Sequence, residues 1–203
     1  MQMNFQILKE EILARLSLHS DPALTYHTAG HTADVLCTAE RIALEEGITD
    51  PQKLLLLKVA ALYHDTGFLY AYKGHENKSC EIVRKELVDL NFTENDINTI
   101  CSLIMATKIP QSPQNHLEEI LCDADLDYLG RDDFEPISNH LRKEFFKLGI
   151  VNTEEEWMQL QIRFFESHQY FTKTSREKRN GKKMQHLEQL KRQVRLNTSN
   201  KYL

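Results

Sequence analysis

The sequence lacks closely spaced cysteine pairs and any long uncharged hydrophobic segment. The first residues, MQMNFQILKEEILARL, carry charges through their apolar stripe, so they predict neither a signal peptide nor a membrane span. Cysteines occur four times, always singly and within helical apolar patterns where a thiol is usually buried: Cys37, Cys80, Cys101 and Cys122. We therefore expect a cytoplasmic protein with no disulfide and no cysteine-bound zinc.

The sequence also lacks internal repeats, low-complexity stretches and any alternation of apolar and polar residues long enough to predict a β-strand. Apolar residues instead recur with a helical period, as in Phe5, Leu8, Ile12 and Leu16. With 203 residues, of which 41% are hydrophobic and 27% charged, the chain has the composition of a globular protein. We predict an all-α fold of about eight to ten helices.

No segment has the composition of a linker, so we expect one compact helical domain over residues 1–203, with its core at about 20–170. The net charge of −5 is unevenly spread. Residues 172–195 contain nine Lys and Arg against two Glu, a local charge of +7 that leaves −12 for the remainder. This segment predicts a basic C-terminal helix, either with a solvated face or contacting an anion.

Turn residues mark several helix ends. Gly47 follows one apolar helical pattern, and Asp50 with Pro51 has the composition of the next helix start, where aspartate caps and proline occupies the first turn. Thr93 with Asp96 has the spacing of a capping box.

The apolar run KLLLLKVAALYHDTGF ends on two polar residues, His64 and Asp65, that commonly bind metals. Adjacent side chains on an ideal helix point about 100° apart and would not easily share an ion. The pair therefore indicates a helix terminus, and Gly67 can let the chain turn there because glycine accepts positive φ.

Two further places supply matching ligands. Upstream, TYHTAGHTADV puts His27 and His31 four residues apart; Gly30 breaks the pattern, and we expect His27 in the turn before the helix, near the site. Downstream, CDADLDYLG sets out three acidic residues after a buried-looking run, and these need a cation, hydrogen bonds or water: Asp123, Asp125 and Asp127.

The ordered set of His31, His64, Asp65 and Asp125 resembles the H…HD…D metal ligands of the HD-domain metal-dependent phosphohydrolases, an all-helical superfamily. Asp125 is assigned because ADL resembles the Ala-Asp segment of that family, with Asp123 as the alternative. The segment YHTAGHTADV is similar to one in the cyclic-nucleotide phosphodiesterases, which share this helical metal core. The resemblance implies a general acid at the position of His27.

The chain departs from these families at positions that supply further metal ligands. Phe68 stands where phosphodiesterases have another histidine, and Lys108 stands where some relatives have a late ligand. Between the HD pair and the last aspartate, only His75 and His116 are available as extra histidines. We therefore expect one metal ion, with Mn²⁺, Fe²⁺, Co²⁺, Ni²⁺ or Zn²⁺ favoured over Mg²⁺ by the nitrogen ligands.

The chemistry expected from this set is hydrolysis of a phosphate monoester or diester of a small molecule, with a nucleotide as one candidate. Asp65 would orient or deprotonate the attacking water, and His27 would protonate the leaving oxygen. Four residues are candidates for contacting the substrate: Lys73, His75, Lys108 and Arg131.

The sequence is compatible with other functions. A regulatory module could keep the metal and nucleotide pocket without turnover, whereas a di-iron oxygenase would need more histidines than the sequence supplies. The acidic remainder of the chain argues against a nucleic-acid partner, and no membrane partner is expected. The expected partner is a small phosphorylated substrate, and a homodimer is compatible with the sequence.

Overall fold

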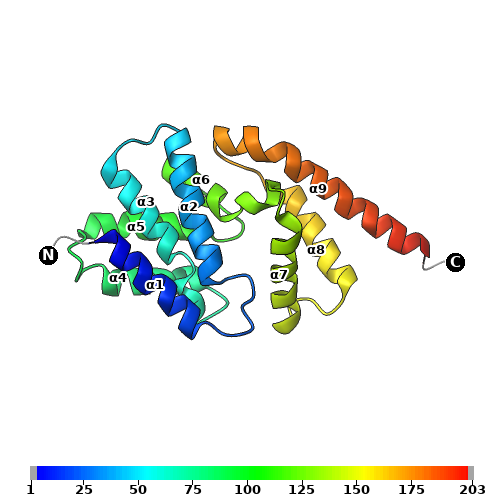
Figure 1. Cartoon of the computed structure of the whole chain (residues 1–203), viewed down its shortest axis with the longest axis horizontal. Coiled ribbons are helices and arrows are strands. Elements are labelled where there is room, and N and C mark those ends of the chain that lie inside the picture. Colours follow the sequence, from blue (N-terminus) through cyan, green and yellow to red (C-terminus); the bar gives the residue numbers. More distant parts are fainter. Residues whose placement is uncertain (1–3, 201–203) are drawn as a thin grey trace. The chain divides into compact units, whose positions relative to one another are not determined.

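The computed structural model describes the backbone of residues 4–200, which form helices and no strand. The helices, in chain order, are α1 (Phe5–His19), α2 (Ala29–Glu45), α3 (Pro51–Tyr63), η1 (Thr66–Leu69), α4 (His75–Glu86), α5 (Glu94–Ala106), α6 (His116–Asp125), η2 (Asp127–Gly130), α7 (Phe134–Lys147), α8 (Glu154–Ser167) and α9 (Lys173–Asn200). Here η denotes a 3-10 helix. This confirms the predicted all-α fold (Figure 1). Within this range no helix is long and apolar enough to cross a membrane.

The helices form two compact units that divide between Leu126 and Asp127. The first contains α1 to α6 with η1, and the second contains η2 and α7 to α9. The expectation of a single domain over the whole chain stays a prediction.

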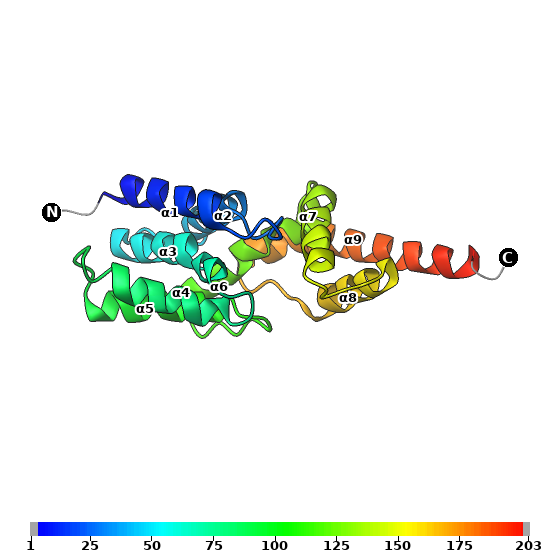
Figure 2. The same ribbon diagram turned by 90° about the horizontal axis from the view of Figure 1, so that it is seen from below.

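Helix α3 forms the centre of the first unit. It packs against α1, α2, α5 and α6, and Figure 2 shows it between the α1–α2 pair and the α4–α5 pair. Its last five residues, 59–63, are all apolar or aromatic and buried, and Leu57, Leu62 and Tyr63 are completely buried. Because a helix that is apolar all round belongs in the interior, the residues directly after α3 are delivered into the core.

The predicted caps explain where two of these helices begin. The side chain of Asp50 accepts hydrogen bonds from the first backbone N–H groups of α3, and Pro51 occupies the first turn. Thr93 and Asp96 form the predicted capping box at the start of α5. After α2, Gly47 has φ +80°, a conformation that favours glycine. The caps satisfy N–H groups that a helix start leaves without intrahelical partners.

In the second unit, η2 is held against α9. The Arg179 guanidinium donates two hydrogen bonds to the Asp127 carboxylate, at 2.8 and 3.1 Å. A Cβ atom at Gly130 would lie 2.4 Å from the Arg179 carbonyl oxygen, so only glycine permits this approach. Phe134 and Phe165 pack edge to face nearby, with ring centroids 5.2 Å apart. A buried carboxylate is stable in this unit because a guanidinium pairs with it.

Candidate metal centre

The His64 and Asp65 pair lies at the end of α3, as expected. Helix α3 ends at Tyr63, His64 caps it, and the chain continues into η1. This change of helix type brings the adjacent side chains together, with His64 Nε2 3.2 Å from Asp65 Oδ2. Both residues are buried, at 1% and 4% exposure.

Gly67 is required for a different reason from the one expected. It is absent from the glycines with positive φ, so backbone conformation does not demand it. Instead, a Cβ atom there would lie 1.9 Å from the carbonyl oxygen of His75 and 2.9 Å from the backbone nitrogen of Ser79. Glycine at this position lets the start of α4 pack directly on the turn that carries the HD pair.

Ser79 joins α4 to that turn and was not identified from the sequence. Its hydroxyl accepts a hydrogen bond from the Gly67 N–H at 2.8 Å and donates one to the His64 carbonyl oxygen at 2.7 Å. Ser79 is completely buried. One side chain therefore satisfies two buried backbone groups on either side of Asp65.

His31 from α2 and Asp125 from α6 complete the cluster. His31 Nε2 lies 3.4 Å from Asp65 Oδ2 and 3.1 Å from Asp125 Oδ1, and His64 Nε2 lies 3.6 Å from the same Asp125 oxygen. Side-chain exposure is 8% for His31 and 16% for Asp125. The structure thus brings together the four proposed ligands, and the position of the Asp125 carboxylate favours it over Asp123.

The donor atoms of the cluster fit a metal ion. His64 Nδ1 lies 2.8 Å from the Ala61 carbonyl oxygen, which fixes the proton on Nδ1 and leaves Nε2 to face the cluster. His64 Nε2 and Asp65 Oδ2 are buried without a hydrogen-bond partner among residues 4–200. One atom each from His31, His64 and Asp65 lies within 4.8 Å of the others. Buried polar atoms without partners are costly, and a shared divalent cation would satisfy them.

The electrostatics of the cluster also favour a cation. Burial lowers the pKa of His64, but the carboxylates of Asp65 and Asp125 outweigh burial and raise that pKa well above its usual value. Burial acts to raise the pKa of Asp65 and Asp125. The His64 and His31 imidazoles outweigh burial, so the pKa of each aspartate lies below its usual value. The carboxylates therefore stay ionised only beside positive charge, which either protons or a metal ion can provide.

Aromatic and imidazole rings border the cluster on one side. The Phe68 ring stacks on His27 and on His75, with centroids 4.2 and 3.8 Å apart. His75 Nδ1 lies 3.2 Å from the Tyr72 carbonyl oxygen, and its Nε2 lies 3.5 Å from Asp65 Oδ1. His27 precedes the N-cap of α2, as expected. The Phe68 ring therefore lies between the His27 and His75 rings.

The remaining predicted residues lie in more exposed places. Lys73 precedes α4 and Lys108 follows α5, and both are exposed. In the second unit, Arg131 donates hydrogen bonds to the Asp133 carboxylate at 2.8 and 2.5 Å. Substrate contacts by these three cations stay predictions.

The fold and the site together define an all-helical protein with a candidate metal centre of two histidines and two aspartates. Residues 28–127 match the family model of the HD domain, and the chain belongs to the HD-domain superfamily through this segment. A crystal structure of a predicted HD superfamily hydrolase from an uncultured Thermotogales bacterium is similar over 95% of this chain and 98% of that chain. The TM-score is 0.57 and the sequence identity is 22%, a likeness that shows the shared fold. The comparison with curated proteins gives no match.

Proposed function

We propose that this chain is a metal-dependent phosphohydrolase that cleaves a phosphate monoester or diester of a small molecule, with nucleotides as the first candidates. The observation that carries this proposal is the convergence of His31, His64, Asp65 and Asp125, with two buried polar atoms that lack partners among the described residues. The HD family match and the name of the similar hydrolase structure support the same reaction class.

The cluster is suited to one divalent transition-metal ion. Two imidazoles and two carboxylates favour Mn²⁺, Fe²⁺, Co²⁺, Ni²⁺ or Zn²⁺ over Mg²⁺. When bound, such an ion polarises a phosphoryl oxygen and lowers the pKa of water to about 7. His64 would bind through Nε2, because its Nδ1 is held by the Ala61 carbonyl group.

Two residues are proposed for proton transfer. Asp65 Oδ2 faces His31 and His64, whereas Oδ1 faces His75, so Oδ1 is the atom that would accept the proton of the attacking water. His27 would donate a proton to the leaving oxygen as the phosphorus–oxygen bond breaks. The products are phosphate, or a phosphate monoester, and an alcohol.

Around these groups, His75 is proposed as a substrate contact. Its Nε2 lies 3.5 Å from Asp65 Oδ1, next to the proposed reacting centre. Glu76 Oε1 lies 3.7 Å from the same nitrogen. From this position the His75 imidazole would contact a substrate bound next to Asp65.

The test begins with elemental analysis of the purified protein, followed by a screen of phosphate esters and nucleotides with the identified metal. We expect hydrolysis that falls by at least about a thousandfold in His64→Ala and in Asp65→Ala, because each change removes a ligand. The exposed positions His19→Ala and Asp89→Ala are matched controls that should retain activity. Unchanged hydrolysis in both ligand variants would refute the proposal.

The same protein preparations distinguish an enzyme from a regulatory binding module. We expect nucleotides that raise the melting temperature also to release product when metal is present. A nucleotide that stabilises the metal-loaded protein without turnover, across the whole panel, would favour the regulatory module instead.

A further inference from the structure

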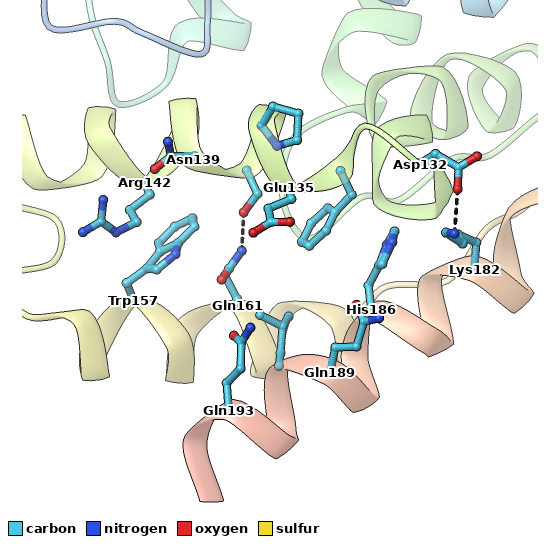
Figure 3. A pocket seen from close by; sticks show the side chains of 14 residues that line it. Asp132, Glu135, Asn139, Arg142, Trp157, Gln161, Lys182, His186, Gln189 and Gln193 are labelled. Carbon is cyan, nitrogen blue, oxygen red and sulfur yellow. Dashed lines mark hydrogen bonds and ion pairs between the residues drawn. The ribbon is translucent and has the colours of Figure 1, made fainter. Parts of the chain in front are cut away.

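The second unit contains a cavity of about 740 Å³ lined by residues of α7, α8 and α9 and by the loop before α7 (Figure 3). None of the proposed metal ligands lines it, and all of its lining residues belong to residues 127–200. Its volume lies within the range of about 300–1,000 Å³ that small-molecule sites occupy.

Aromatic side chains form part of the lining. Phe134, Trp157 and His186 line the cavity, and because they are only 7%, 4% and 7% exposed, each presents a small part of its ring to it. The His186 imidazole stacks on Phe134, with centroids 4.6 Å apart and the ring planes 20° from parallel. The exposed parts of these rings form an aromatic wall, which favours contact with a ligand that has aromatic surface of its own.

The polar groups of the lining are mostly side-chain amides. Gln161 is buried and donates from Nε2 to the Ser138 hydroxyl at 2.5 Å, which leaves its Oε1 as an acceptor. Asn139, Gln189 and Gln193 add exposed amides around the opening (Figure 3). Each amide offers a donor and an acceptor side by side, the arrangement that pairs with the edge of a nucleobase.

His186 contributes a further acceptor of defined orientation. Its Nδ1 lies 3.1 Å from the Leu129 carbonyl oxygen, so Nδ1 donates to that oxygen and Nε2 is the ring nitrogen left for a ligand. A heterocyclic N–H or exocyclic amino group would complement this nitrogen and the Gln161 oxygen.

The charges of the lining disfavour a phosphorylated ligand. Lys182 forms an ion pair with Asp132 at 2.6 Å, and Arg142 donates to Glu154 at 2.7 Å, so both cations of the lining already have carboxylate partners. Glu135 adds another carboxylate at the exposed rim. A phosphate group would have to displace a carboxylate from one of these cations.

We propose that this cavity binds a neutral, planar nitrogen heterocycle of the nucleobase or nucleoside class. The aromatic wall favours a ring, the clustered amides favour a heterocycle with donors and acceptors at its edge, and the pairing of both cations with carboxylates favours a neutral ligand. The proposal does not depend on the reaction at the metal centre, because no proposed metal ligand lines the cavity.

Trp157 allows a direct test, because it is the only tryptophan in the chain and it lines the cavity. The intrinsic fluorescence of the whole 203-residue chain would be titrated with adenosine, with AMP and with ribose, with correction for absorption by the ligand. We expect a saturable change with adenosine, at least tenfold weaker binding of AMP, and no change with ribose. Equal affinity for AMP and adenosine, or no saturable change with any nucleoside up to millimolar concentration, would overturn the proposal.

Variants then locate the bound ligand. Gln161→Leu and Gln193→Ala should each weaken adenosine binding several-fold, whereas Gln185→Ala, an exposed glutamine of α9 outside the lining, should not. If Gln161→Leu does not fold, the comparison of Gln193→Ala with Gln185→Ala decides. His64→Ala should bind adenosine as the unmodified protein does, and loss of binding there would assign the ligand to the metal centre and reject this cavity.

Discussion

At the residue scale, Gly67 is the position in the metal centre where the backbone of α4 packs directly on the turn that carries His64 and Asp65. An added methyl group would overlap the His75 carbonyl oxygen, which belongs to backbone and cannot rotate away. We expect Gly67→Ala to lower the free energy of unfolding by about 3 kcal/mol, at the upper end of the usual cost of overpacking. Chemical denaturation would measure this loss, and elemental analysis would show a reduced metal content.

Gly181 provides the matched control for that substitution. It lies within α9, and nothing would lie within 4 Å of a Cβ atom there. Gly181→Ala should leave stability unchanged or raise it by up to about 1 kcal/mol, because alanine is the better helix former. Equal effects of the two substitutions would show that close packing does not explain Gly67.

The raised pKa of His64 gives metal binding a pH dependence of defined sign. In the metal-free protein the carboxylates of Asp65 and Asp125 outweigh burial and raise the pKa of His64 well above its usual value, so the imidazole binds its proton more tightly. A metal ion must displace that proton, so affinity should rise from about pH 6 to about pH 8 by roughly tenfold per unit for each proton released. Calorimetry in buffers of different ionisation enthalpy would count the protons. Affinity that is independent of pH over this interval would contradict the predicted proton displacement.

At the scale of the element, Ser79 connects α4 to the turn between α3 and η1. Ser79→Ala would leave the Gly67 N–H and the His64 carbonyl group buried without their hydroxyl partner. We expect a loss of about 2–3 kcal/mol of stability and, because these groups hold the ligand turn, metal affinity reduced by about 10- to 100-fold. Thermal denaturation and metal titration would measure the two effects.

Ser167 is the control for Ser79. Its hydroxyl also donates to a backbone carbonyl, that of Phe164 at 3.1 Å, but the residue is exposed at the end of α8. Ser167→Ala should change stability by less than about 0.5 kcal/mol, since water replaces the lost partner. If Ser79→Ala were equally mild, the turn would be held by its own packing.

Helix positions could be predicted because their signals are local. The cap at Asp50, the capping box at Thr93 and the apolar run of α3 all lie within a few residues of the feature that they specify. The four proposed ligands could be named for a related reason, since their residue types and order along the chain resemble a known metal set. Local pattern and resemblance do not require knowledge of distant contacts.

The features that could not be predicted all depend on contacts between separate elements. The role of Ser79 exists only because α4 packs on the ligand turn, and the same approach explains Gly67. Phe68 was identified as a missing histidine, but its stacking between His27 and His75 requires three segments to meet. Periodicity in one segment carries no information about which side chain another segment places beside it.

At the scale of the whole molecule, the proposed ligands and the single tryptophan belong to different units. His31, His64, Asp65 and Asp125 all precede the division at Leu126, and Trp157 follows it. Each unit also has buried apolar residues of its own, such as Leu57 in the first and Phe165 in the second. Trp157 fluorescence therefore reports on the second unit, whereas far-ultraviolet circular dichroism reports on all of the helices.

This separation predicts an unequal response to removal of the metal. A ligand that binds only the folded state at 100 times its dissociation constant stabilises that state by about 2.7 kcal/mol. We expect a chelator to lower the midpoint temperature of the unfolding transition seen by circular dichroism and to leave the midpoint reported by Trp157 unchanged, because all four proposed ligands belong to the first unit. The measurement is a pair of thermal scans with and without chelator, with Asp65→Ala as the metal-free reference. Two transitions that move together would contradict this expectation and support the single cooperative domain predicted from the sequence.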